Sequence, residues 1–153
     1  MIKIDKPTLN DVESIQSIIN EFAKKKDILP RNIEDVAERI REFIVAKDND
    51  TVVAISSLRL YYPFLAEIRT IAVKNEYQGQ GIAKRLIEYE IEEAKRLAVK
   101  KVFALTFQLK FFESVGFKLI DKKQLPQKKI WEDCVNCPFF PDCKEEAVIK
   151  YLD

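Results

Sequence analysis

The sequence predicts a mixed α/β fold (α+β with a mixed sheet), and three observations support this fold class. Segments with the apolar period of a helix are interleaved with short, β-branched segments typical of strands. No internal repeat or low-complexity linker interrupts this order. The 153 residues, 47% apolar and 33% charged, are enough for one well-filled core. We therefore expect residues 1–153 to form a single domain with the element order β-α-α-β-β-β-α-β-α-β-β.

The N-terminal elements follow from alternation, capping and spacing. The alternating segment 1–5 favours a strand, and Thr8 with Asp11 three residues later predicts the start of a helix. The basic run 24–26 closes this helix, and a second helix is expected over 32–42. Apolar residues recur at helical spacing and give the first helix one buried face: Leu9, Val12, Ile15, Ile18, Ile19 and Phe22.

From residue 43 onward, strands and helices are expected to alternate. The turn signal at 48–50 predicts a hairpin, and Gly116 is expected to end a short helix in a left-handed conformation. The expected strands are 43–47, 51–60, 66–73, 102–107, 117–120 and 147–151, and the expected helices are 82–98 and 110–115.

Two of the three glycines lie in the short run 77–83, between an expected strand and the longest helix. In a chain this poor in glycine, Gly79 and Gly81 are expected where the backbone needs a positive φ or approaches another group closely. A glycine turn that opens a helix leaves several backbone N–H groups unpaired, and the helix dipole adds positive charge there. Such a site favours a phosphate or diphosphate. Because position 84 is a lysine, the dinucleotide-binding Gly-x-Gly-x-x-Gly pattern is not met.

Charge and residue usage exclude several function classes. The chain has 26 Lys and Arg against 25 Asp and Glu, without a basic stripe among aromatics, so we expect no nucleic-acid partner. We find no signal-peptide pattern and no apolar run of membrane length, so we expect a cytoplasmic protein with no membrane partner. The chain contains no histidine, which excludes imidazole catalysis and His-ligated metals. Any general base must be a carboxylate, Lys, Tyr, Cys or water.

Three segments, in this order, resemble signatures of the GNAT superfamily of acetyl-CoA-dependent N-acetyltransferases. Residues 66–73 resemble the fourth strand of that family. Residues 78–83, Gln-Gly-Gln-Gly-Ile-Ala, resemble its Gln/Arg-x-x-Gly-x-Gly/Ala signature. Residues 111–117, Phe-Phe-Glu-Ser-Val-Gly-Phe, resemble its later Phe/Tyr-x-x-x-Gly-Phe element. The resemblance covers almost the whole chain and implies a GNAT-like fold, with a central, mostly antiparallel sheet, splayed fourth and fifth strands, and flanking helices.

The resemblance also implies acetyl-CoA as the co-substrate. Backbone amides at the start of the longest helix would bind its diphosphate, and main-chain groups of the fourth strand would pair with the pantetheine arm. One unpaired N–H would polarise the thioester carbonyl. The residues implied in coenzyme binding are Ile71, Ala72, Val73, Gln78, Gly79, Gln80, Gly81, Ile82, Ala83, Lys84 and Phe112.

Glu67 lies where some GNAT enzymes carry a catalytic glutamate, so the resemblance implies a general base that deprotonates the acceptor amine. Strand alternation would place Glu67, Arg69, Ile71 and Val73 on one face. The structural alternative for this carboxylate is an ion pair with Arg69 or a nearby lysine.

The proton donor for the departing thiolate is left open by the sequence. Phe112 stands where the family usually presents a tyrosine, and the asparagine that many members carry after the fifth strand is not evident. Thr106 and Gln108 are the nearest polar groups. Water, Tyr61, Tyr62 or the departing ammonium proton are the candidates.

We expect the partner to be a small-molecule amine or amino acid. The segments 105–108 and 125–143 resemble short-form bacterial N-acetylglutamate synthases, which implies the α-amine of L-glutamate as acceptor and a role in arginine biosynthesis. An acceptor with two carboxylates requires cations in its pocket. The candidate substrate-binding residues are Arg69, Arg59, Gln108 and, after them, Lys129. For Lys129 the alternative is an ion pair or a solvated surface charge without a role in binding.

The three cysteines, Cys134, Cys137 and Cys143, are one ligand short of a tetrahedral zinc site unless Asp133, Asp142 or water completes it. A disulfide and free or packed thiols are the alternatives. We expect no metal to be required.

Two further functions stay open from the sequence. One is acetyl transfer to another amine, such as a polyamine, an antibiotic or a protein N-terminus; a polyamine would require an acidic pocket. The other is a non-catalytic acetyl-CoA-binding sensor, which Phe112 in place of a tyrosine favours. Either is compatible with a homodimer.

Overall fold

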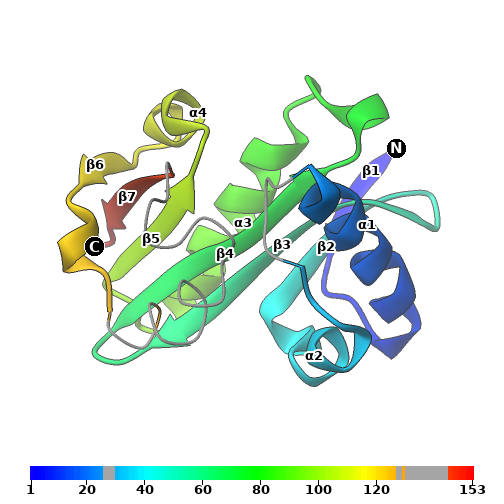
Figure 1. The fold of residues 1–153 in the computed structure, drawn as a ribbon, viewed down its shortest axis with the longest axis horizontal. Coiled ribbons are helices and arrows are strands. Elements are labelled where there is room, and N and C mark those ends of the chain that lie inside the picture. The colour runs from blue at the N-terminus through cyan, green and yellow to red at the C-terminus, as the bar shows by residue number, and fades with distance from the viewer. Residues whose placement is uncertain (26–29, 127–128, 130–144) are drawn as a thin grey trace.

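A computed structural model describes residues 1–25, 30–126, 129 and 145–153, and it confirms the mixed α/β fold (Figure 1). Every predicted strand, and both helices predicted after residue 80, lie within two residues of their expected bounds. The first predicted helix begins as a 3-10 turn at Leu9, and its α-helical part starts at Val12. The second helix is shorter than predicted. The strands are β1 (Ile2–Asp5), β2 (Phe43–Asp48), β3 (Thr51–Tyr61), β4 (Leu65–Val73), β5 (Lys101–Thr106), β6 (Lys118–Ile120) and β7 (Glu146–Tyr151). The helices are α1 (Val12–Lys24), α2 (Ile33–Glu38), α3 (Ile82–Arg96) and α4 (Leu109–Ser114), and short 3-10 turns are η1 (Leu9–Asp11), η2 (Ile40–Glu42), η3 (Asn75–Tyr77) and η4 (Lys122–Gln124).

The strands form one sheet in the order β1-β2-β3-β4-β5-β7-β6. Every neighbouring pair is antiparallel except β4 and β5, which are parallel and are connected through α3. The predicted mostly antiparallel sheet is therefore confirmed, and its one parallel pair lies in the middle of the sheet.

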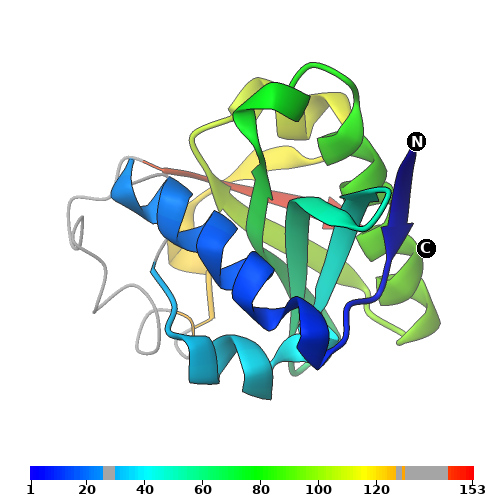
Figure 2. The same cartoon turned by 90° about the vertical axis from the view of Figure 1, so that its right-hand side faces the viewer.

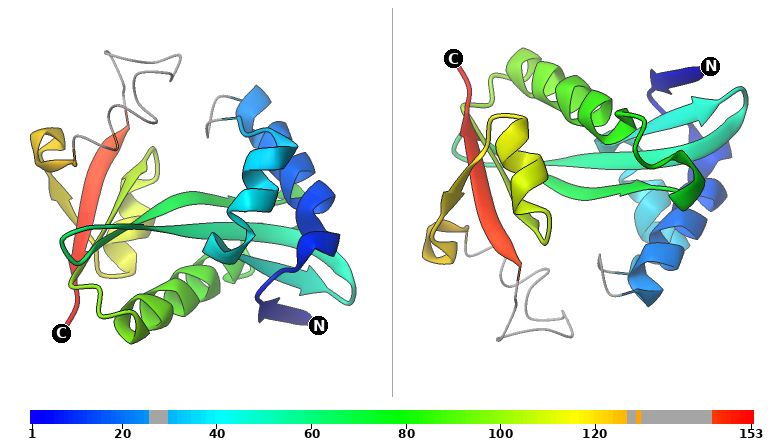
Figure 3. Two further views of the ribbon diagram at one scale, coloured as in Figure 1. Left: turned by 90° about the horizontal axis from the view of Figure 1, so that it is seen from below. Right: turned by 90° about the horizontal axis from the view of Figure 1, so that it is seen from above.

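Helices cover both faces of the sheet. The apolar faces of α1 and α2 pack with Phe43, Val45 and Ile55 on one face, whereas α3 packs on the other face against side chains of β2, β3 and β4 (Figures 2 and 3). The short helix α4 shares the α3 face, because its Phe112 belongs to the same buried cluster as Ile87 of α3.

The N-terminal caps form as the sequence predicts. The Thr8 hydroxyl accepts a hydrogen bond from the Asn10 amide at 3.2 Å, and the Thr8 amide donates to Asp11 at 2.9 Å, a capping box. Gly116 follows α4 with a φ of 98°, the predicted left-handed conformation.

The predicted helix 32–42 is wrong in its second half, since α2 ends at Glu38 and a separate 3-10 turn follows. Arg39 sits between the two with φ −108° and ψ 22°. Its guanidinium lies 3.3 Å from Asp35 and 2.9 Å from Glu42, and these ion pairs favour the compact turn that leads directly into β2.

The predicted alternation along β4 is also wrong, because the strand contains a bulge. Thr70 pairs with Ser57 and Ile68 with Leu58, so Arg69 is the extra residue between two consecutive β3 positions. Before the bulge Ile68 packs toward α3, and after it Ile71 and Val73 do. Glu67 therefore lies on the opposite face from Ile71 and Val73.

Within the described residues, no helix is both long and apolar enough to cross a membrane. The same part of the chain contains no group of three or more His, Cys, Asp or Glu side chains that could hold a metal ion. The three cysteines considered for zinc lie outside the described residues.

Candidate active site between strands β4 and β5

The two parallel strands pair over only three residues and then separate. Leu65, Ala66 and Glu67 pair with residues 101–103, and β5 continues to Thr106 paired only to β7. The β4 edge over 68–73 thus carries no strand partner among the described residues. Figure 3 shows β5 and β7 diverging from β3 and β4. An open strand edge of this kind can pair with an extended ligand.

A cavity of about 870 Å³ fills the space between the diverging strands. Its walls come from the open edge of β4, the turn before α3, the end of β5, α4, and Arg31 and Lys129. A volume of this size is in the range of small-molecule and cofactor sites. Of the sequence-predicted residues, it brings together Glu67, Arg69, Ile71, Ala72, Val73, Gln78, Gly79, Gly81, Ile82, Ala83, Lys84, Gln108 and Phe112.

The N-terminus of α3 opens onto this cavity without a cap of its own. Its N-cap is Gly81, which has no side chain to accept a hydrogen bond, and the first turn contains no acidic residue. The first helical hydrogen bond runs from the Arg85 amide to the Gly81 carbonyl at 3.2 Å, so the amides before Arg85 precede the helix's own ladder. By contrast, α2 is capped by the Asn32 side chain. The α3 terminus is therefore suited to an external anion.

Both glycines of the turn adopt the left-handed conformation predicted for them, with φ of 81° at Gly79 and 78° at Gly81. A Cβ atom built on either glycine would find no atom within 4 Å, so the turn leaves open space beside its backbone. The backbone of the turn is therefore accessible to a ligand from this side.

Gln78 anchors the turn to the preceding strand. Its amide nitrogen donates to the Val73 carbonyl at 3.0 Å and to the Asn75 side chain at 3.2 Å. Tyr77, in the same turn, donates its hydroxyl hydrogen to Asp48 at 2.7 Å. These bonds fix the turn between β4 and α3, so Gln78 acts here on the backbone of its own chain.

Glu67 is almost fully buried, at 1% exposure, and both of its carboxylate oxygens have a partner. The Tyr61 hydroxyl donates to Oε1 at 3.1 Å, and the Lys129 ammonium lies 2.7 Å from Oε2. The proposed base thus faces the cavity with a lysine beside it, as the structural alternative from the sequence anticipated. Tyr62, the other tyrosine weighed as proton donor, is 86% exposed and does not line the cavity.

Arg31 lines the cavity, although no sequence pattern points to it. Its side chain is 3% exposed, its Nε lies 2.6 Å from Asp35, and its guanidinium stacks 4.9 Å over the Phe43 ring. Its Nη1 and Nη2 atoms have no hydrogen-bond partner within the described part of the chain. Burial, together with the like charge of Arg69, lowers the pKa of Arg31 below its usual value. Two guanidinium groups are thus close together on one wall, which favours an anionic ligand.

Asp35 compensates only part of this positive charge. Burial opposes the ionised form of Asp35, but the hydrogen bond and charge of Arg31 outweigh it and lower the pKa of the Asp35 carboxyl. Asp35 accepts the Arg31 hydrogen bond at Nε, and no other described residue bonds to the Nη atoms, which suits them to a ligand.

Several predicted residues lie elsewhere or act differently from the expectation. Arg59 does not line this cavity; it pairs with Glu67 in register, stacks 5.5 Å over the Tyr61 ring, and lines a second cavity of about 280 Å³. Gln80 is exposed and outside the cavity lining. Phe112 lines the cavity but is 2% exposed and packs edge-on against Phe111 and Phe117.

The charged lining of the cavity is predominantly basic. Among the described residues, the lining contains five cationic side chains and two carboxylates: Lys25, Arg31, Arg69, Lys84 and Lys129, with Glu67 and Glu145. This balance suits an acidic ligand better than a polycation.

The chain is similar in sequence and fold to known proteins. Residues 9–117 match the acetyltransferase (GNAT) family. An uncharacterised N-acetyltransferase of Chlorobaculum tepidum is 38% identical over 94% of this chain and 92% of its own length. The amino-acid acetyltransferase of Mycobacterium tuberculosis is 31% identical over 82% of this chain and 73% of its own length.

Solved structures match over the full chain. N-acetylglutamate synthase from Neisseria gonorrhoeae, complexed with coenzyme A and N-acetyl-glutamate, has a TM-score of 0.90 at 20% identity. This match covers all of the present chain and 35% of that longer protein. Rv2747 of Mycobacterium tuberculosis, in a complex that includes CoA, has a TM-score of 0.83 at 26% identity and covers 99% of both chains. By family match, relatives and fold, the chain belongs to the GNAT family and is an acetyl-CoA-dependent N-acetyltransferase.

Proposed function

We propose that this enzyme acetylates the α-amine of L-glutamate or a closely related acidic amino acid, the N-acetylglutamate synthase reaction of arginine biosynthesis. The observation that carries this proposal is Arg31, a buried guanidinium on the cavity wall near Arg69, with two nitrogens that have no hydrogen-bond partner among the described residues. A guanidinium binds a carboxylate through two parallel hydrogen bonds, and an acidic amino acid has two carboxylates to offer. The structural similarity to a synthase solved with N-acetyl-glutamate supports the same acceptor.

The coenzyme is proposed to lie along the open edge of β4. The amides of residues 81–84 bind the diphosphate, and main-chain groups of Ile71 and Val73 pair with the pantetheine arm. Bound acetyl-CoA supplies the acetyl thioester. This arrangement places the acceptor between the strand edge and the two arginines.

Glu67 is proposed to accept a proton from the acceptor ammonium, directly or through a water molecule. The neutral amine then forms the new C–N bond as the C–S bond breaks. The nitrogen then gives its second proton to the departing thiolate, and the proton on Glu67 is released to water, so the transfer needs no other co-reactant.

A panel of acceptors tests the specificity. Purified protein, acetyl-CoA and single amines are mixed, and free thiol is followed. We expect thiol release with L-glutamate to exceed that with L-glutamine, which has the same shape without the second carboxylate, and with spermidine. Equal rates across glutamate, glutamine and spermidine would contradict an acidic acceptor.

Arg31→Lys tests the residue on which the assignment depends. Lysine keeps the charge but loses the fork, so we expect the KM for the acidic acceptor to rise about ten- to hundredfold, the effect of losing charged hydrogen bonds. The KM for acetyl-CoA should stay near the wild-type value. Arg41→Met, an exposed arginine close by in the fold, is the matched control and should change neither constant. An unchanged KM for the acceptor in Arg31→Lys would show that Arg31 does not bind the acceptor.

A further inference from the structure

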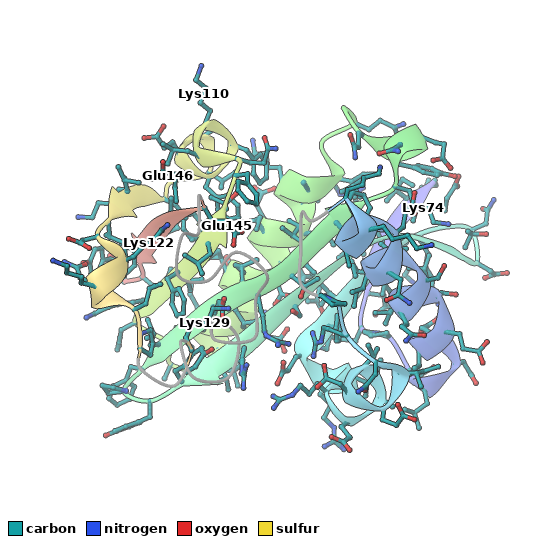
Figure 4. All side chains as sticks on the ribbon, viewed as in Figure 1. Lys74, Lys110, Lys122, Lys129, Glu145 and Glu146 are labelled. Carbon is teal, nitrogen blue, oxygen red and sulfur yellow. The ribbon has the colours of Figure 1, made fainter. Side chains whose placement is uncertain are left out.

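Lys129 reaches the candidate active site from the C-terminal part of the chain. Its ammonium lies 2.7 Å from Glu67 Oε2, although the two residues are far apart in sequence. The side chains are 6% and 2% exposed, so both charges are withdrawn from water. Figure 4 shows Lys129 lying over the sheet in the region of β4. Nothing in the glycine turn or the strand signature of the family points to this lysine.

The buried carboxylate depends on its neighbours for its charge. A carboxylate out of water favours the neutral acid unless a cation and hydrogen-bond donors compensate it. Lys129 supplies a cation at Oε2, and the Tyr61 hydroxyl supplies a donor at Oε1. With a donor at each oxygen, the plane of the carboxylate is fixed, and Arg59, opposite Glu67 on β3 and 5% exposed, is a second buried cation on the neighbouring strand.

The proposed base must be unprotonated before the acceptor arrives. If Glu67 carried a proton at neutral pH, it could not take one from an ammonium group. A cation 2.7 Å from Oε2 compensates the charge of the carboxylate, yet Lys129 itself is not consumed: the proton enters Glu67 from the acceptor and leaves to water after the transfer.

We propose that Lys129 is a positioning residue for acetyl transfer, holding Glu67 ionised and oriented so that it can accept the acceptor's proton. The inference rests on the proposed role of Glu67 as base. If the ion pair were only structural, replacing Lys129 would leave the pH dependence of kcat unchanged. If Lys129 acts through Glu67, replacing it shifts the acid limb of the kcat–pH profile.

Lys129→Met is the direct test, assayed with whichever amine the acceptor panel favours. We expect the acid limb of kcat to move upward by about one pH unit or more, so that kcat at a pH on the wild-type acid limb falls about tenfold or more. Lys129→Arg, which keeps a cation, should return the limb most of the way to its wild-type position. Lys123→Met, an exposed lysine earlier in the same connection, is the matched control and should keep the wild-type profile.

The double variant separates an effect through Glu67 from any other effect. In a Glu67→Gln background, Lys129→Met should cause little further loss, because the group it acts on is already neutral. Should Lys129→Met fail to fold by circular dichroism, Lys129→Gln, which keeps a hydrogen-bond donor without charge, carries the same pH test.

Three results would overturn the inference. One is a wild-type pH profile in Lys129→Met; another is an equal loss in the Glu67→Gln background. A third is a lower KM for the acceptor at unchanged kcat, which would mean that the lysine competes with the acceptor for Glu67. Full activity of Glu67→Gln would instead show that Glu67 is not the base. A preference for a non-acidic amine would contradict only the proposed acceptor.

Discussion

Arg31 illustrates how a residue becomes functional through its neighbours. In the sequence it follows Pro30 and precedes the N-cap of α2, a position typical of a solvated charge. In the structure the same side chain is buried over Phe43, close enough to Arg69 of β4 for that charge to lower the pKa of Arg31. No pattern along the chain predicts that Arg31 and Arg69 lie close together, because this depends on how α2 packs across the sheet.

Glu90 is a second buried charge, remote from the proposed chemistry. It lies on the sheet side of α3 with 0% exposure, and neither carboxylate oxygen has a hydrogen-bond partner in the described part of the chain. Burial, reinforced by the like charges of Glu93 and Glu42, raises the pKa of Glu90 to about 8 against the opposing pull of Lys6 and the nearby Ser56 hydroxyl. Glu90 is therefore protonated in the folded protein at neutral pH.

This raised pKa makes folding stability depend on pH in a defined direction. Between the ordinary pKa of 4.5 and about 8, the unfolded chain has Glu90 ionised while the folded chain retains the proton. Raising the pH through this window therefore favours unfolding, and the loss is complete once the pH passes about 8. We expect Glu90→Gln, which does not titrate, to gain stability relative to wild type between pH 5 and pH 8, by a few kcal/mol, order of magnitude.

Urea denaturation at several pH values measures this difference. Glu92→Gln, an exposed position on the same helix, is the control and should track the wild-type curve at every pH. A constant difference in unfolding free energy between Glu90→Gln and wild type from pH 5 to pH 8 would contradict a protonated Glu90.

At the scale of single elements, we expect coenzyme binding to depend on the left-handed conformation of Gly81 in the turn between β4 and α3. Gly81→Ala places a side chain at a φ of 78°, a strained conformation that costs about 1–2 kcal/mol, and directs a methyl group into the open space beside the turn. We expect the KM for acetyl-CoA to rise at least about tenfold. Calorimetry with coenzyme A and steady-state kinetics provide the two measurements.

Gly116→Ala is the matched control for this turn. Gly116 also has a left-handed φ, 98°, and its added Cβ would lie 2.8 Å from the Lys150 ammonium, away from the cavity. Both variants should lose stability, but only Gly81→Ala should lose coenzyme affinity. Equal affinity losses in the two variants would mean that strain alone, and not the position of the turn, weakens binding.

The element order and the glycine turn could be predicted from the sequence because their causes are local. Helical spacing, the Thr8 cap and the glycines each act within a few residues of where they stand. The bulge at Arg69 could not be predicted, since it is defined by pairing with β3, and it reverses the faces of Ile71 and Val73. Packing between distant elements likewise decides that Arg31 lines the cavity and that Arg59 does not.

Across the whole molecule, the sheet has two parts joined by a short seam. One part contains β1 to β4 with α1, α2 and α3, and the other contains β5, β6 and β7 with α4 (Figure 1). The strands at the seam pair only over Leu65–Glu67 and residues 101–103. Beyond those pairs the cavity separates the two parts, so a ligand lying in it contacts both.

Coenzyme A is therefore expected to act as a bridge between the two parts. At a concentration about 100-fold above its Kd it should stabilise the fold by about 2.7 kcal/mol through mass action. It should also slow amide hydrogen exchange at Ile71 and Val73 of β4 together with the end of β5, because its pantetheine arm fills the open edge. ADP offers a diphosphate without that arm, and should protect only the turn before α3. If coenzyme A gave the ADP pattern, the ligand would be held by its diphosphate alone, and the open edge of β4 would lose its role in holding the thioester against Glu67.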